Sequence, residues 1–287
     1  MNATWERARD IVVGVDPVRD WRLPVAWAAD EAHRRRLPLR LVLAVPPQHD
    51  TQHVDDTPRQ IALRSSGADR LRQAESWVRD RHPEVTVSTD LLAGSPARVL
   101  AAQSRHTRLV VLGSRHLGRA AEFFSAGSTT VPVTAQAACP VAVVGDAEHV
   151  TQQPPYLVVG IDGSTAATDA LAFAFDEADR RGADLRVVCV WQPALFMLND
   201  EEVALKAQRL LLSEATAGLA GNHPDVHVTH EALTGHPVEE LARAAEHALA
   251  LVVGRRGRGG YTGMRLGSVS HGLLHRAHCP VITVPTR

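Results

Sequence analysis

Ile11-Val-Val-Gly-Val-Asp16 recurs as Leu157-Val-Val-Gly-Ile-Asp162, and this repetition decides the fold. The offset between matching residues drifts only from 146 at the two aspartates to 140 at a later pair of cysteines. A period of this length indicates two tandem copies of one structural module. The further matching blocks, in the same order in both copies, are Glu31-Ala32 with Glu177-Ala178, 41–45 with 187–191, 93–96 with 234–237, Gly113 with Gly254, and 139–141 with 279–281.

Each copy alternates short runs of Val, Ile and Leu with longer segments of helical period. Runs that are apolar on both faces are typical of parallel strands covered by helices on both sides. The βαβαβαβαβ order, with right-handed crossovers, predicts an α/β fold with a doubly wound, five-stranded parallel sheet in each copy. We expect strands near 11–16, 39–45, 85–90, 108–113 and 141–144, and again near 157–162, 185–191, 226–231, 249–254 and 281–284.

The polar, proline-containing stretch 145–155 reads as a linker between the copies. It predicts a first domain at residues 1–146 and a second at 154–287. The apolar runs 141–144 and 281–284 occupy equivalent places, and an unpaired edge strand is an aggregation hazard. We therefore expect the two repeats to form an intramolecular pseudo-dimer through these runs, and further homo-oligomers stay open.

The composition excludes several classes of protein. The 287 residues carry a net charge of −1, so no basic excess points to nucleic acid. No run of 18 apolar residues and no apolar signal segment occurs, so we expect a soluble, cytoplasmic protein without a membrane span. Cys139, Cys189 and Cys279 lie beside apolar residues and form no CxxC pair, which predicts buried, reduced thiols.

A glycine-rich loop follows the fourth expected strand of the second copy. It begins at Gly254, passes through Gly257 and ends at Gly267-Ser268, where a helix over 268–277 is expected to start. Glycines allow close approach of the backbone to a ligand, and the free amides of a helix N-terminus attract anions. The loop therefore predicts a phosphate site, with cationic charge from Arg255, Arg256, Arg258 and Arg265.

Rival motifs are missing or incomplete. The first strand of the second copy is followed by Gly160-Ile-Asp-Gly163 and not by GxGxxG, and the chain has no GK[ST] triplet. The only lysine is Lys206, on a helix, so a phosphoacceptor site is unsupported. The sets 271/275/278 and 223/227/230 are histidines at spacings that suggest metal binding, but no partner ligands complete them, so no protein metal site is expected.

The chain resembles the universal stress protein family in its tandem form. The ATP-binding members carry Gly-x2-Gly-x9-Gly-Ser/Thr, which residues 254–268 match in full, and the turn at 162–164 and the closing run 279–284 also resemble the family. The resemblance implies the family's fold, an adenine nucleotide α-hydrolase-like fold, over both copies. The residues that it implies at the nucleotide are Asp162, Gly163, Ser164, Val190, Gly254, Arg255, Gly257, Arg258, Gly267, Ser268, Val269 and Ser270.

The resemblance further implies a nucleotide-linked stress or dormancy regulator that binds ATP together with Mg²⁺. No residue is assigned a catalytic role, because the loop offers no poised base or nucleophile pair. A slow ATPase or an AMP-transferring enzyme of related fold stays open as the alternative.

The first copy departs from this pattern. His116 replaces the second glycine, the spacer before the last glycine is one residue longer, and Pro17 follows the first aspartate. We therefore expect the first copy to bind ATP weakly or not at all. The residues that keep a site there open are Asp16, Gly113, Gly127 and Ser128.

Overall fold

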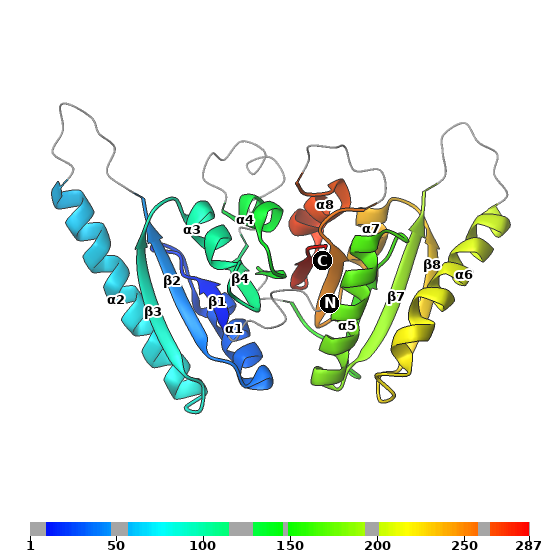
Figure 1. Ribbon diagram of the computed structural model, residues 1–287, viewed down its shortest axis with the longest axis horizontal. Helices are drawn as coiled ribbons and strands as arrows, with labels where there is room; N and C mark the ends of the chain where they lie inside the picture. Colours follow the sequence, from blue (N-terminus) through cyan, green and yellow to red (C-terminus); the bar gives the residue numbers. More distant parts are fainter. Residues whose placement is uncertain are drawn as a thin grey trace. The chain divides into compact units, whose positions relative to one another are not determined.

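The computed structural model describes residues 10–46, 57–114, 129–145, 149–192, 201–257 and 265–286. The chain divides into two compact units, which are described one at a time. Unit 1 holds the described residues up to Val144, and unit 2 holds those from Gly145 onward. Each unit is an α/β sandwich of helices on a parallel sheet (Figure 1).

Unit 1 has a five-stranded parallel sheet in the order β3-β2-β1-β4-β5. Helices α1 and α2 pack together on one face of the sheet, and α3 and α4 pack together on the other. Its elements are β1 (Ile11–Gly14), α1 (Arg22–Arg35), β2 (Leu39–Val45), α2 (Thr57–Arg81), β3 (Val87–Ala93), α3 (Pro96–Gln103), β4 (Leu109–Gly113), α4 (Thr130–Gln136) and β5 (Val141–Val144).

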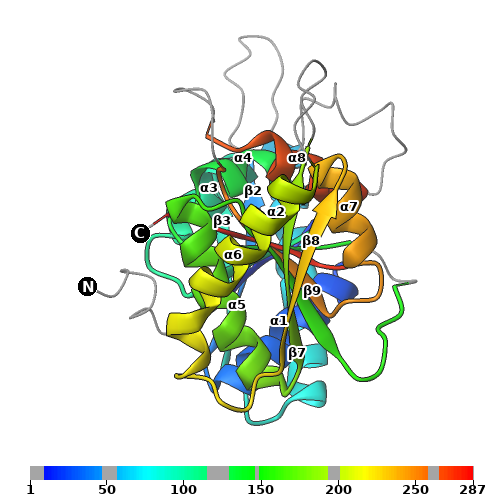
Figure 2. The same ribbon diagram turned by 90° about the vertical axis from the view of Figure 1, so that its right-hand side faces the viewer.

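Unit 2 repeats this topology with the order β8-β7-β6-β9-β10. Helices α5 and α6 lie on one side of the sheet, and α7 lies on the other beside α8 (Figure 2). Its elements are β6 (Tyr156–Gly160), α5 (Thr165–Arg181), β7 (Asp184–Trp191), α6 (Glu201–Ala220), β8 (Val228–Thr234), α7 (Pro237–Ala244), β9 (Ala250–Gly254), α8 (Ser268–Arg276) and β10 (Val281–Val284). Among the described helices, none combines the length and apolar character needed to cross a membrane.

The doubly wound parallel fold expected from the sequence is confirmed in both units. In each, the chain runs outward from β1 or β6 to two strands on one side, then returns to place β4 or β9 on the other. The adjacent carboxyl ends of the strands at this reversal form the usual ligand crevice of such sheets.

The outer strands β3 and β8 differ from the expected bounds. The expected strands cover 85–90 and 226–231, whereas β3 and β8 each begin two residues later and end three residues later. Every residue of β2 from Leu39 to Val45 has a partner in β3, and β7 pairs in the same way with β8 from Leu185 to Trp191. Pairing with a long neighbour thus overrides the weak apolar pattern of these strands.

The repeated Glu-Ala pair has a structural role. Glu177 is 1% exposed and accepts hydrogen bonds from Nε and Nη2 of Arg181 at 3.2 and 3.0 Å. Glu31 is fully buried and pairs in the same way with Arg35, while Arg34 donates to its second oxygen at 3.0 Å. A buried carboxylate requires such compensation, so both helices carry the same internal ion pair.

The two units differ in the turn after the first strand. Gly163 has φ +77°, which a proline cannot adopt because its ring holds φ near −65°. Ser164 then caps α5 through its Oγ, which accepts from the amide of Ala167 at 3.2 Å. Unit 1 has Pro17 in place of this glycine, and its first helix begins only at Arg22, one turn later than α5. The turns after β1 and β6 therefore differ in the path of the backbone as well as in their side chains.

All three cysteines are buried free thiols, as expected. Burial raises the pKa of Cys279 to about 12 and raises that of Cys139 further. Since the thiolate is the reactive species, we expect iodoacetamide at neutral pH to leave both unmodified in the folded chain and to label both in denaturant. Peptide mass spectrometry measures this, and rapid labelling of either residue without denaturant would contradict it.

Candidate functional site

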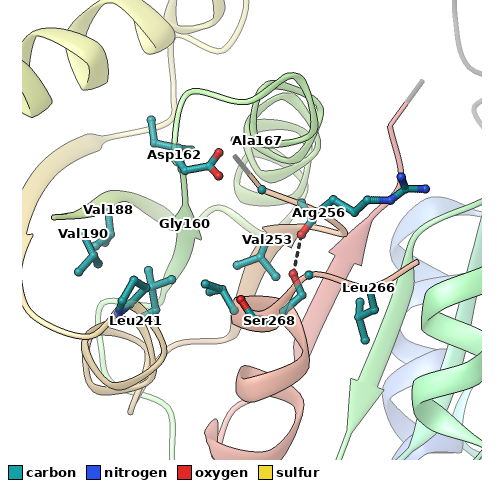
Figure 3. Close-up of a pocket in the computed structure, with 17 residues that line it drawn as sticks. Gly160, Asp162, Ala167, Val188, Val190, Leu241, Val253, Arg256, Leu266 and Ser268 are labelled. Carbon is teal, nitrogen blue, oxygen red and sulfur yellow. Dashed lines mark hydrogen bonds between the residues drawn. The ribbon is translucent and has the colours of Figure 1, made fainter. Parts of the chain in front are cut away.

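A cavity of about 480 Å³ lies at the carboxyl ends of β6, β7 and β9, at the reversal point of the unit 2 sheet (Figure 3). Its volume is within the range of small-molecule sites, about 300–1,000 Å³. Helix α7 closes one side and the N-terminus of α8 another. The described lining residues are Gly160, Ile161, Asp162, Ala167, Val188, Val190, Pro237, Leu241, Val253, Gly254, Arg256, Gly257, Leu266, Gly267, Ser268, Val269 and Ser270.

One side of the cavity is apolar. Val188 and Val190 of β7 lie beside Leu241 of α7, away from Arg256 (Figure 3). Sequence reasoning found Val190 but missed Val188, which shares its face because side chains two apart in a strand point the same way. Leu241 comes from another helix, and no local pattern marks it. The wall suits a flat, largely apolar ring.

Asp162 enters the cavity from the turn after β6. Its Oδ1 accepts a hydrogen bond from the amide of Ser164 at 3.0 Å, which fixes the carboxylate. Gly163 and Ser164, which the resemblance implies at the nucleotide, are not among the described residues that line the cavity. They shape the turn and cap α5.

The three motif glycines differ in what a side chain at each position would meet. A Cβ on Gly254 would lie 2.8 Å from the backbone of Ala166, so the end of β9 can approach α5 only as glycine. A Cβ on Gly257 would collide with Oδ2 of Asp162. Gly267 is the N-cap of α8 with φ −72°, and a Cβ there would make ordinary contacts of 3.4 Å or more. Close packing, rather than positive φ, accounts for the first two glycines.

The N-terminus of α8 faces the cavity through Ser268, Val269 and Ser270. The first amides of a helix lack partners within the helix, and they carry the positive end of its dipole. Ser270 is 3% exposed, and its Oγ donates to the carbonyl of Gly254 at 2.7 Å. Its hydroxyl therefore ties the helix to β9, and Ser270 also lines the cavity where the resemblance implies a nucleotide contact.

Positive charge gathers beside this helix end. Arg256 lines the cavity, while Arg255 is half-buried behind the lining and Arg258 lies outside the described residues. Burial lowers the pKa of Arg255, and the charges of Arg256 and Arg265 lower it further. The positive charges of the three neighbouring guanidinium groups repel one another, and a bound anion would relieve this repulsion.

Unit 1 has a smaller cavity, of about 130 Å³, at the equivalent place. Asp16 and Gly113 line this cavity, whereas Gly127, Ser128 and His116 lie outside the described residues. Oδ1 of Asp16 accepts hydrogen bonds from the amides of Val18 and Arg19 at 2.8 and 3.0 Å. This carboxylate therefore stabilises the turn that precedes α1, which is longer than the corresponding turn of unit 2.

The fold and the cavity define a class: a tandem, doubly wound α/β protein with a crevice at the carboxyl edge of its second sheet. The sequence profile of the Universal stress protein family matches residues 8–145 and 156–285. The chain is 35% identical over 290 residues to the universal stress protein Rv2005c of Mycobacterium tuberculosis and 33% identical over 288 residues to Rv2623 of the same species, each match covering 95% of both chains. The chain thus belongs to the universal stress protein family.

A solved structure supports the fold. The crystal structure of a universal stress protein from Archaeoglobus fulgidus superposes with a TM-score of 0.74 and 18% identity, covering 96% of each chain. At this level of identity the likeness concerns the fold alone, and both units take part in it.

Proposed function

We propose that unit 2 binds ATP and that the protein acts as a nucleotide-linked stress or dormancy regulator. The observation that carries this proposal is the pairing of an apolar wall with an anion-attracting helix end inside one cavity. Val188, Val190 and Leu241 would receive the adenine ring, and the amides at Gly267–Ser270 would receive the phosphates, with Arg256 beside them.

The glycine loop supports the same assignment. Gly257 lets the backbone of the loop lie directly against the carboxylate of Asp162, and both residues line the cavity. Mg²⁺ suits a triphosphate in this setting, because it is usually held by phosphate oxygens and water with few protein ligands. We propose domains with the bounds 1–146 and 154–287, whereas pairing of the two repeats, further self-association and a cytoplasmic location stay predictions.

An enzyme is the second candidate, either a slow ATPase or an AMP-transferring protein. Among the described lining residues, the ionisable side chains are Asp162 and Arg256. Arginine does not act as a base at neutral pH, and one oxygen of Asp162 already accepts a backbone hydrogen bond. Steady-state hydrolysis assays on the purified chain decide between the two: sustained turnover would favour the enzyme, and stable retention of intact ATP would favour the regulator.

We expect one ATP per chain. The unit 1 cavity has about a quarter of the volume of the unit 2 cavity, and its first helix lacks the turn that follows the aspartate in unit 2. Isothermal titration of nucleotide-free protein should give a stoichiometry near one. Asp16→Ala should leave that value and the affinity unchanged. Two equivalent sites per chain would contradict the expectation, as would loss of half the binding in a Gly127→Val variant.

A further inference from the structure

Two histidines and a glutamate converge at the end of unit 1 that bears the amino ends of β2 and β3. His33 lies in the last turn of α1, and His82 and Glu84 lie in the turn between α2 and β3. One ligand atom from each of the three lies within 4.8 Å of the others. Nδ1 of His33 contacts Oε1 of Glu84, and Nδ1 of His82 lies 3.4 Å from the same oxygen.

The ring of His82 is oriented from behind. Its Nε2 lies 2.7 Å from Oδ1 of Asp30, which Arg81 holds through Nε and Nη2 at 2.9 and 3.0 Å. The carboxylate of Asp30, held in place by Arg81, offers an acceptor to Nε2 of His82. A proton on that nitrogen leaves the lone pair on Nδ1, the atom that lies 3.4 Å from Oε1 of Glu84.

Nδ1 of His82 and Oε1 of Glu84 are thus neighbouring electron-pair donors, and a cation between them can be bound by both. A carboxylate behind a histidine, with the opposite nitrogen directed at the ion, is the usual outer shell of a metal-ligating histidine. The rings of His33 and His82 are stacked with their centroids 4.6 Å apart, and Nδ1 of each lies near Oε1 of Glu84.

Surrounding positive charge is largely compensated within unit 1. Arg34 and Arg35 pair with Glu31, and Arg81 pairs with Asp30, which leaves Arg36 as the other cation lining the adjacent hollow. The hollow has a volume of about 620 Å³, enough for water to complete a coordination shell.

Unit 2 provides an internal contrast. The equivalent positions hold Asp179, His223 and Asp225, with Asp176 in place of Asp30. His223 lies 3.6 Å from Asp176 and 3.5 Å from Asp179, beyond the range of a good hydrogen bond. The equivalent positions of unit 2 thus offer one imidazole and two carboxylates, whereas the cluster in unit 1 offers two imidazoles and one carboxylate. The two clusters therefore differ in the metal ligands that they provide.

We propose that His33, His82 and Glu84 bind one divalent transition-metal ion, with water as a further ligand and Asp30 as a positioning residue. Two imidazole nitrogens and a carboxylate oxygen suit Zn²⁺ and its neighbours rather than Mg²⁺. Tetrahedral Zn²⁺ requires ligand atoms roughly 3.4 Å apart. The three ligand atoms lie within 4.8 Å of one another, and the His33 side chain is 51% exposed, so it has room to adjust around an ion.

The test is titration of the full, chelator-treated chain with ZnCl₂ in excess Mg²⁺. We expect one equivalent of Zn²⁺ to bind in the micromolar range or tighter. His33→Ala and Glu84→Gln should each weaken this binding by about tenfold or more, and Asp30→Asn by roughly ten- to hundredfold. His106→Ala, which removes an exposed histidine of unit 1 outside the cluster, is the matched control and should change nothing.

A second readout guards against misfolded variants. Co²⁺ in the wild-type chain should give the visible absorption of a low-coordinate N/O site, and Glu84→Gln should remove it. Glu84 is an exposed side chain, and far-UV circular dichroism together with ATP retention by unit 2 checks that this variant is folded. Equal Zn²⁺ affinity in the wild type and in His33→Ala would overturn the proposal, because the ion would then bind elsewhere among the 15 histidines. Absence of Zn²⁺ binding would also overturn it and would assign a proton network to the cluster.

Discussion

Replacing Gly257 with valine should abolish measurable ATP binding to the full chain. The new Cβ would overlap Oδ2 of Asp162, whose other oxygen is fixed by the amide of Ser164, and the branches of the valine would extend into the cavity. Each hydrogen bond to a charged phosphate that is lost costs about 1.5–3 kcal/mol, or roughly tenfold to hundredfold in affinity. Titration calorimetry of nucleotide-free protein measures the effect.

The fold should survive this change, because the contact concerns one carboxylate rather than backbone. Gly221→Val is the matched control: it makes the same chemical change after α6, where a Cβ has nothing within 4 Å. Gly267→Val should also weaken binding, whereas Gly267→Ala should be mild because its Cβ makes ordinary contacts. Unchanged affinity in Gly257→Val would show that the phosphates do not lie against this loop.

Replacing Glu177 with alanine should destabilise unit 2 by about 3–5 kcal/mol, as removal of one partner of a buried ion pair does elsewhere. Arg181 is 6% exposed in its side chain and would be left charged in the protein interior. Hydrogen exchange of peptides from α5 reports the stability of this unit separately, and its slowest amides should exchange about two to nearly four orders of magnitude faster.

Glu177→Gln is expected to fall between the wild type and Glu177→Ala, because an amide oxygen still accepts from the guanidinium. Glu214→Ala, on the exposed face of α6, should leave exchange in α5 unaltered. A loss below about 1 kcal/mol in Glu177→Ala, the value of an exposed pair, would mean that water reaches Arg181 readily.

The sequence predicted the bounds of several strands well and those of β3 and β8 less well. The strands at 39–45, 141–144 and 281–284 are almost entirely apolar, with Arg40 and Thr283 as the exceptions, so their ends coincide with the ends of the apolar runs. Strands β3 and β8 carry polar residues such as Asp90 and His230 in their interiors, and their lengths are set by the partner strand. The lengths of β3 and β8 depend on pairing with the neighbouring strand, and the local pattern of apolar residues does not predict them.

The site was predicted where a single segment builds it. The loop from Gly254 and the helix start at Gly267–Ser270 follow from spacing, and they line one cavity. Leu241 and Val253 come from separate elements, and only the tertiary structure brings them together. The hydroxyl of Ser270 has its acceptor in Gly254, a pairing across sixteen residues that no motif shows. His33, His82 and Glu84 were likewise missed, because forty-nine residues separate the histidines.

Pro17, which follows the first aspartate, limits any attempt to give unit 1 a pocket like that of unit 2. At Gly163 the main chain turns through a conformation closed to Pro17, and the helix that follows starts at a different point. Grafting the side chains of one half onto the other would therefore leave their anchoring atoms displaced. Restoring a second pocket would require Pro17→Gly first, with Val18→Ser to cap the regained turn, and only then the exchange of loop residues. The turn has to be rebuilt because in unit 2 it directs Asp162 into the cavity and fixes its carboxylate.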